Sequence, residues 1–293
     1  MSSTSGEVAL LGPAQIRELA NTLDLTPTKR RGQNFVIDPN TVRRIVRLAN
    51  ITDADQVLEV GPGLGSLTLG LLEQAASVTA IEIDQRLAEQ LPRTVQMYAP
   101  GYTDRLTVIA DDALQTGLPP KDLPPPTALV ANLPYNVAVP VLLRVLTEVP
   151  SIQRGLVMVQ KEVADRLVAG PGSRVYGVPS VKLAWFGHAK PVGNVPPGVF
   201  WPAPHVDSGL VEFVVSPASD DAQLRDAVFA TVDAAFSQRR KTLRSALADW
   251  AGGKDQVDEI CRRAGIDSAQ RGEALTLSEF AALATARTEQ GHL

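Results

Sequence analysis

The chain has 293 residues, 44% hydrophobic and 20% charged, with a net charge of −4 at pH 7, which excludes a disordered or fibrous protein. The single cysteine, Cys261, excludes an internal disulfide, and three scattered histidines show no metal-binding spacing, so we expect no metal. The sequence contains neither a membrane-length apolar run nor a leader, which predicts a cytoplasmic protein without a membrane partner.

The first 26 residues are expected to form a loosely ordered extension with one short helix that begins at Pro13, a residue favoured in a first helical turn. Asp38 and Pro39 then supply a cap and a first-turn proline for the next helix, whose apolar positions form one face. The core domain is expected to follow directly.

From Gln56 onward, short apolar segments rich in β-branched residues alternate with helix-length segments at 66–76 and 85–97. This alternation predicts a parallel sheet covered by helices, with an antiparallel end formed by its last two strands. The strands are expected at 57–60, 78–81, 106–109, 128–130, 156–159, 181–186 and 210–215.

After Pro217 the strand pattern stops and helical spacing predicts segments near 220–236, 239–250, 255–264 and 276–287. The expected fold class is therefore α/β, a Rossmann-like sheet of the class I methyltransferase type with a smaller all-helical C-terminal domain. We expect three parts: the extension 1–26, the α/β domain 27–217 and the helical domain 218–293.

A glycine-rich turn with Gly61 and Gly63 lies between a predicted strand and a helix, where a ligand can approach the main chain closely. The third glycine of a dinucleotide motif is missing, because Ser66 and Thr68 occupy the two possible positions. The pattern is better suited to S-adenosylmethionine, which has no pyrophosphate group.

Carboxylates follow the next two predicted strands at the same edge of the sheet. Glu82, which we favour over Asp84, is placed to accept hydrogen bonds from both ribose hydroxyls of the cofactor. Asp112 is placed to accept from the adenine amine, although either acid can instead be a simple cap or turn residue.

The fourth strand ends in a motif typical of methylation of amino groups attached to a conjugated ring, formed by Asn132, Leu133, Pro134 and Tyr135. The Asn132 amide oxygen and the Leu133 carbonyl are expected to accept the two hydrogens of an adenine N6 amine, and Pro134 to set the turn. Tyr135 is expected to stack on a flipped-out base. The alternative is an ordinary turn at the end of a buried strand.

Three further regions are candidates for nucleic-acid contact. Phe200, in a proline-rich loop, is expected to stack on the other face of the target adenine, unless the loop only closes the sheet edge. Because the net charge is negative, RNA binding requires local basic patches, which otherwise are solvated faces. The candidates are Lys29, Arg30, Arg31, Arg239, Arg240, Lys241 and Arg244.

Five segments in this order resemble the small-subunit ribosomal RNA adenine dimethyltransferase family of the KsgA type: 31–35, 59–65, 132–136, 200–208 and 236–244. The resemblance extends from about residue 28 to beyond 280. It implies N6,N6-dimethylation of two adjacent adenosines near the 3′ end of small-subunit rRNA, within an immature small subunit, by a protein that we expect to be a monomer.

The resemblance also implies that Asn34 and Val36 contact the cofactor, together with Gly61, Glu82, Asp112 and Asn132. Val36 departs from the leucine usual in the family, which matters little if the contact is made by the main chain. Two alternatives stay open: a large-subunit rRNA dimethyltransferase of the macrolide-resistance type, and a weakly catalytic ribosome-assembly or transcription factor with the same fold.

Overall fold

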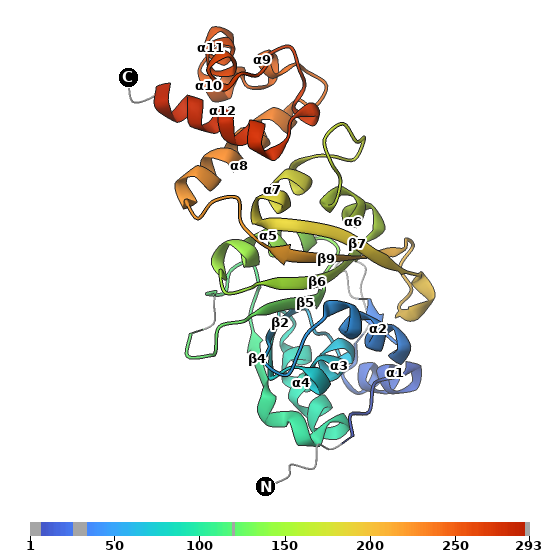
Figure 1. Ribbon diagram of the computed structural model, residues 1–293. Coiled ribbons are helices and arrows are strands. Elements are labelled where there is room, and N and C mark those ends of the chain that lie inside the picture. Colours follow the sequence, from blue (N-terminus) through green and yellow to red (C-terminus); the bar gives the residue numbers. More distant parts are fainter. Residues whose placement is uncertain (1–6, 26–33, 119–120, 291–293) are drawn as a thin grey trace. The chain divides into compact units, whose positions relative to one another are not determined.

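The computed structural model of the chain describes residues 7–25, 34–118 and 121–290 (Figure 1). The predicted basic residues Lys29, Arg30 and Arg31 lie outside these ranges. The chain divides into two compact units, the first formed by residues 1–164 and 190–214 and the second by residues 165–189 and 215–293. No helix in the described ranges has the length and apolar character that crossing a bilayer demands.

The predicted α/β fold is confirmed by a seven-stranded sheet with the order β4-β3-β2-β5-β6-β9-β7. Neighbouring strands from β4 to β6 are parallel, whereas β6 and β9 are antiparallel, with Arg154 opposite Val214 and Gln160 opposite Ser208. The strands are β2 (Gln56–Val60), β3 (Ser77–Glu82), β4 (Leu106–Ala110), β5 (Ala128–Asn132), β6 (Arg154–Gln160), β7 (Gly187–Val195) and β9 (Ser208–Val215).

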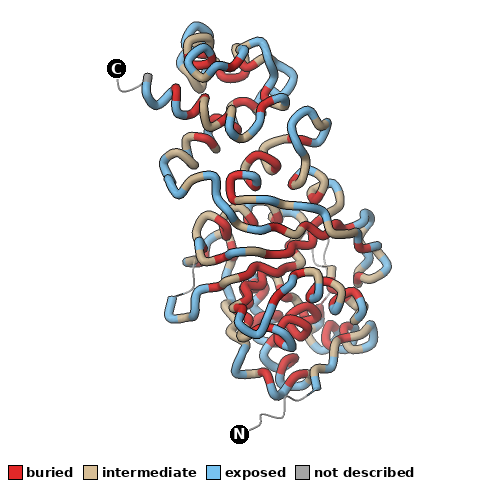
Figure 2. Tube along the Cα trace, viewed as in Figure 1, coloured by how far each residue is buried: buried red, intermediate tan, exposed pale blue. Residues whose placement is uncertain are grey.

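The centre of this sheet is fully buried, as the concentration of buried residues along β2 and β5 shows (Figure 2). Four consecutive residues of β5, 128–131, are buried, so both faces of that strand are covered. The chain proceeds from β2 outward through β3 and β4, then returns to place β5 on the other side of β2. The carboxyl ends of β2 and β5 therefore form the position at which α/β sheets bind ligands.

The helices of the first unit are α1 (Pro13–Thr22), α2 (Pro39–Ala49), α3 (Ser66–Gln74), α4 (Gln85–Tyr98) and α5 (Ala138–Glu148), with 3-10 turns η2 (Pro100–Arg105) and η3 (Pro197–Val199). The predicted start of α2 is confirmed, because Asp38 accepts hydrogen bonds from the Thr41 main chain at 2.9 Å and from its hydroxyl at 2.6 Å. The helix predicted at Pro13 is also confirmed.

The expectation that the N-terminal extension is loosely ordered is wrong for residues 7–25. Leu11, Ile16 and Leu19 are buried in the same apolar cluster as residues of α2, α3 and β5. The Ala9 amide also donates to the Tyr98 carbonyl at the end of α4, at 2.8 Å. Burial of these apolar side chains attaches the extension to the sheet domain.

Two short strands form a separate antiparallel ribbon, β1 (Phe35–Val36) and β8 (Phe200–Trp201). In this ribbon Phe35 lies opposite Trp201 and Val36 lies opposite Phe200. Since side chains alternate along a strand, Phe35 and Trp201 lie on one face of the ribbon, and Val36 and Phe200 lie on the other.

The strand predicted at 181–186 is wrong: this segment belongs to α7 (Val178–Phe186), and the sheet strand β7 begins directly after it. A short apolar run does not by itself distinguish a buried helix from a strand. Here a first-turn proline starts the helix, and Trp185 and Phe186 pack edge-on against Phe229, with ring centroids 6.3 and 6.0 Å apart.

The second unit is helical, with aromatic contacts at its centre. Phe236 contacts Tyr176 and Phe280, with centroids 6.0 and 6.1 Å apart, and the Tyr176 hydroxyl donates to the Leu275 carbonyl at 2.8 Å. The boundary between the two units differs from the one expected after residue 217, because residues 165–189 also belong to the second unit. The helices are α6 (Lys161–Leu167), which begins in the first unit, α7, α8 (Ala222–Ser237), α9 (Leu243–Ala246), α10 (Ala248–Ala251), α11 (Lys254–Ala264), η4 (Gly272–Ala274) and α12 (Leu277–Gln290).

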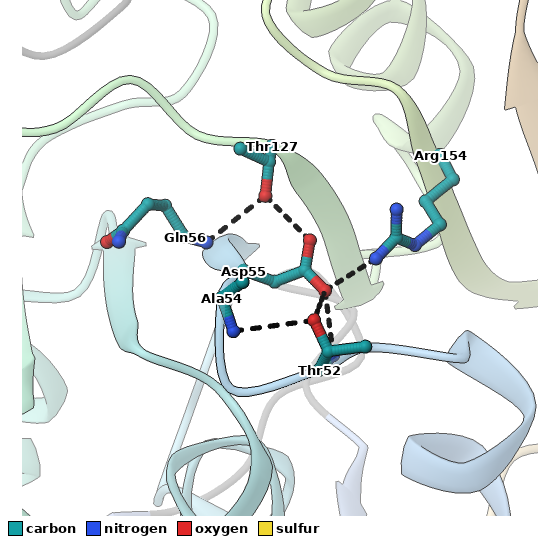
Figure 3. A network of polar contacts seen from close by, with 6 residues as sticks. All are labelled: Thr52, Ala54, Asp55, Gln56, Thr127 and Arg154. Atoms are coloured by element: carbon teal, nitrogen blue, oxygen red, sulfur yellow. Dashed lines mark hydrogen bonds and ion pairs between the residues drawn. The ribbon is translucent and has the colours of Figure 1, made fainter.

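A polar network joins the amino ends of β2, β5 and β6, at the edge of the sheet opposite to their carboxyl ends (Figure 3). Asp55 accepts hydrogen bonds from the Thr127 hydroxyl at 2.8 Å and the Thr52 main chain at 2.7 Å, and it pairs with Arg154 at 2.5 Å. Burial alone raises the pKa of Asp55, but these hydrogen bonds and the Arg154 charge together hold the pKa below its usual value. The network links three neighbouring strands at their amino ends, and two of them, β2 and β5, reach the candidate site at their carboxyl ends.

Candidate active site

A cavity of about 860 Å³ lies at the carboxyl ends of β2, β3, β4 and β5. The structure brings together there all the residues expected to bind a cofactor, although they come from five separate segments. They are Asn34, Val36, Gly61, Gly63, Glu82, Asp112 and Asn132.

The glycine turn approaches its neighbours closely. Gly61 and Gly63 have φ angles of +72° and +59°, which favour glycine, and a Cβ on Gly63 would lie 2.9 Å from the Phe35 ring. A Cβ on Gly61 would lie 3.4 Å from the Pro134 ring. The turn is therefore in contact with both β1 and the segment that follows β5, and a side chain at Gly63 would displace the cavity wall.

Glu82 lies at the end of β3 and is 5% exposed. Its Oε2 accepts from the Gly63 amide and its Oε1 from the Asp84 amide, both at 3.0 Å. Burial raises the pKa of Glu82 more than these main-chain hydrogen bonds lower it. Each carboxylate oxygen has a further lone pair, so the fixed carboxylate can accept additional hydrogen bonds from a ligand.

Glu59 also lines this cavity and was missed as a functional candidate. It lies in β2, is 1% exposed and accepts a hydrogen bond from the Thr68 hydroxyl at 2.7 Å. Burial, with a smaller effect of the nearby Glu82 charge, raises the pKa of Glu59 to about 8. The available signal was a carboxylate among the apolar residues of a buried strand.

Asp112 forms the capping contacts of a turn residue, which was one of its two expected roles. Its Oδ1 accepts from the Leu114 amide at 2.9 Å and its Oδ2 from the Gln115 side chain at 3.1 Å, so it caps the turn after β4. It nevertheless lines the cavity and is only half-buried. The carboxylate is thus oriented by its own turn and still accessible to a ligand.

Asn132 ends β5 at the wall of the cavity. Its Nδ2 donates to the main-chain carbonyl of Asn34 at 3.2 Å. Because a carbonyl only accepts, this contact assigns the nitrogen to that side and directs Oδ1 elsewhere. The side chain is therefore held with an acceptor oxygen available to a substrate.

The other residues of the Asn132 motif are fixed by the sheet. The Leu133 amide donates to the Met158 carbonyl on β6 at 3.0 Å, and the Tyr135 hydroxyl lies 2.6 Å from the Ser208 hydroxyl on β9. Burial raises the pKa of Tyr135. Pro134 lines the cavity, whereas Leu133 and Tyr135 do not.

The role expected for Phe200 requires a correction. Its side chain is 3% exposed, belongs to the apolar cluster and does not line the cavity. The reason is its position in β8, where it pairs with Val36 on the buried face of the ribbon. A ring packed in this way has no face available for stacking on a base.

The late basic cluster also differs from the expectation. Arg239 pairs with Glu273 at 3.0 Å, and Arg244 pairs with Asp258 at 2.7 Å and with Asp255 at 3.2 Å. Arg240 and Lys241 are exposed in the turn after α8 and form no ion pair within the described part of the chain. Within this late basic cluster, Arg240 and Lys241 are therefore the two cations that the structure leaves available to phosphate groups.

The chain is similar in sequence to known proteins of one family. The family model described as "Ribosomal RNA adenine dimethylase" matches residues 26–286. "Ribosomal RNA small subunit methyltransferase A" of Streptomyces griseus is 59% identical over 296 residues, with 100% of both chains covered. The protein of the same name from Kineococcus radiotolerans is 58% identical over 279 residues, with 95% of this chain and 92% of the relative covered.

Two solved structures share the fold. A dimethyladenosine transferase from Plasmodium falciparum has a TM-score of 0.72 and 24% identity, with 87% of this chain and 97% of that chain covered. The 23S rRNA methyltransferase ErmE has a TM-score of 0.61 and 24% identity, with 87% of this chain and 100% of that chain covered. From its sequence matches, the chain belongs to the ribosomal RNA adenine dimethylase family.

Proposed function

We propose that this protein uses S-adenosylmethionine to dimethylate the N6 amines of two adjacent adenosines near the 3′ end of small-subunit rRNA, late in assembly of that subunit. The observation that carries the reaction is the position of Asn132, which lines the same cavity as Glu82 and Asp112 and has its amide oriented by Asn34. Full-length relatives at 56–59% identity named for the small subunit support the choice of RNA.

Four observations support the fit of the cavity to the cofactor. Its volume of about 860 Å³ is within the range of sites for molecules of this size. Gly61 and Gly63 in its turn carry no Cβ atom, so a ligand can approach the main chain there, and the buried Glu82 carboxylate has acceptor positions for ribose hydroxyls. Asp112 supplies a second acceptor for the adenine amine at the end of the next strand.

S-adenosylmethionine supplies an electrophilic methyl group on a sulfonium centre when it is bound. The residues of the chain make the N6 lone pair of the target adenine available, because that pair is delocalised into the ring. In the first transfer Asn132 Oδ1 and the Leu133 carbonyl accept the two N6 hydrogens, and in the second transfer one of these acceptors holds the single hydrogen that remains, which directs the lone pair toward the methyl group. Tyr135, whose hydroxyl is held by Ser208, orients the base by stacking.

Proton removal needs no strong base in this scheme. The N6 proton becomes acidic only as the nitrogen gains positive charge, so the acceptors that orient the amine also stabilise that charge, and the proton then passes to water as S-adenosylhomocysteine is left. We propose that Arg240 and Lys241 contact RNA phosphates, and that the protein acts as a monomer in the cytoplasm. The buried Cys261 fits a reducing compartment.

The test is incubation of the purified protein with unmethylated immature small subunits and labelled S-adenosylmethionine, followed by mass spectrometry of RNA digests. Dimethyladenosine in a fragment near the 3′ end of small-subunit rRNA is the expected product. Label in large-subunit rRNA would contradict the substrate, and RNA binding without label would indicate an assembly factor instead.

A further inference from the structure

We propose that Trp201 is a positioning residue for methyl transfer, because its indole supports the cavity wall that orients Asn132. This inference rests on the proposed function. The indole itself does not line the cavity. It acts through Phe35, with which it forms a stacked pair with ring centroids 6.4 Å apart and an angle of 24° between the ring planes.

The position of the wall that Trp201 supports depends on side-chain contacts. It consists of Asn34 and the two residues of β1, and β1 is paired only with β8 and not with the main sheet. The seven-stranded sheet therefore does not determine where β1 lies relative to the glycine turn. Contacts made by individual side chains do so, together with the short connection from β1 to α2.

Three such contacts join this wall to the sheet domain. The Phe35 ring lies against Gly63, close enough that a Cβ there would be 2.9 Å from it. The Ser66 hydroxyl donates to the Val36 carbonyl at 2.6 Å. The Asn34 carbonyl accepts from Asn132 Nδ2 at 3.2 Å, and this third contact involves the proposed catalytic amide.

Trp201 is the residue opposite Phe35 across the β1–β8 ribbon. The Phe35 ring thus contacts the glycine turn and is also stacked on the indole. Loss of the indole leaves space into which the Phe35 ring can move, and the adjoining Asn34 carbonyl moves with the main chain. The Asn132 amide then loses its fixed orientation, so the acceptor for the N6 amine is misplaced.

The experiment compares Trp201→Ala with Trp201→Phe, which keeps an aromatic ring at this position. Two quantities are measured for each variant: kcat for dimethyladenosine formation at saturating substrates, and the Kd of S-adenosylhomocysteine by calorimetry. For Trp201→Ala we expect kcat to fall at least about tenfold and Kd to rise about threefold or more, since displacements near 1 Å are costly in catalysis. Trp201→Phe should restore both values to within about threefold of the unaltered protein.

A stability control separates positioning from general weakening. Leu19→Ala removes a buried side chain from α1, which does not line the cavity, and should lower Tm without changing kcat or Kd at 20 °C. Phe35→Leu combined with Trp201→Ala should lower kcat no further than Phe35→Leu alone, because both changes act through one contact.

Folded Trp201→Ala protein with unaltered kcat and Kd would overturn the proposal, and so would fully additive effects in the double variant. Failure of the proposed function would give a different result. In that case the unaltered protein would form no dimethyladenosine, whatever residue stands at 201.

Discussion

Thr68 on α3 donates a hydrogen bond of 2.7 Å to Glu59 on β2, so two polar side chains are paired within the apolar interior beneath the cavity. The contact lowers the pKa of Glu59 less than burial raises it, and the pKa is about 8. Glu59 therefore binds a proton in the folded protein at neutral pH, whereas in the unfolded chain it is ionised there.

This difference predicts a pH dependence of stability. Between pH 4.5 and 8 the folded state holds one more proton at Glu59 than the unfolded state, so this residue makes the free energy of unfolding fall as pH rises. Glu59→Gln cannot ionise at this position. As pH rises through that window, its free energy of unfolding should therefore increase relative to that of the unaltered protein, by up to about 1.4 kcal/mol per pH unit. Unfolding by urea at pH 5, 6.5 and 8 measures the gain, and a constant difference would contradict the assignment.

Asp55 is expected to give a pH dependence of stability with the opposite sign. Its folded pKa is lowered, so its ionised form stabilises the fold above the unfolded pKa near 4, and this contribution is lost as pH falls through the still lower folded pKa. Asp55→Asn should cost about 1–3 kcal/mol at pH 7, because it leaves Arg154 without its charge partner. The same urea series should show this cost shrinking below pH 4, whereas an equal cost at every pH would count against the network.

Asn132→Ala should reduce methyl transfer by at least about 100-fold, since it removes the oriented acceptor. RNA affinity should stay within about twofold, because the phosphate contacts are made elsewhere. Label transfer and filter binding measure these two properties. A variant with full activity would eliminate the proposed mechanism.

Gly63→Ala should weaken S-adenosylhomocysteine binding about tenfold or more, since the new Cβ meets the Phe35 ring and the φ angle is positive. Gly252→Ala is the control. It has a φ of +84°, but its added Cβ meets no atom within 4 Å, so it incurs backbone strain alone. Calorimetry should show normal affinity for Gly252→Ala; equal losses in both variants would exclude a local steric effect.

Replacement of both Arg240 and Lys241 by Ala should weaken RNA binding and reduce the slope of log affinity against log salt by about 1 to 2, because fewer counterions are released. The charge-matched control replaces Arg262 and Arg263, which pair with Glu259 on α11. It should leave the slope nearly unchanged. Equal slopes for both double variants would mean that the effect depends on net charge and not on contacts made by Arg240 and Lys241.

The sequence by itself determined where six of the seven sheet strands lie along the chain, β2 to β6 and β9, and which groups stand at the ends of three of them. Glu82, Asp112 and Asn132 each end or follow a strand, and the carboxyl ends of parallel strands meet at one edge of a sheet, so local pattern was enough to place them together. The glycine turn was predictable for the same reason, because its geometry depends on neighbouring residues.

Only the tertiary structure decided which side chains are free to act. Phe200 is buried because it pairs with Val36, and Arg239 is engaged because Glu273 lies beside it. The Asn34 carbonyl orients Asn132 across 98 positions of the chain. Such contacts depend on how distant segments pack, and the residue types at these positions are equally compatible with exposed or paired side chains.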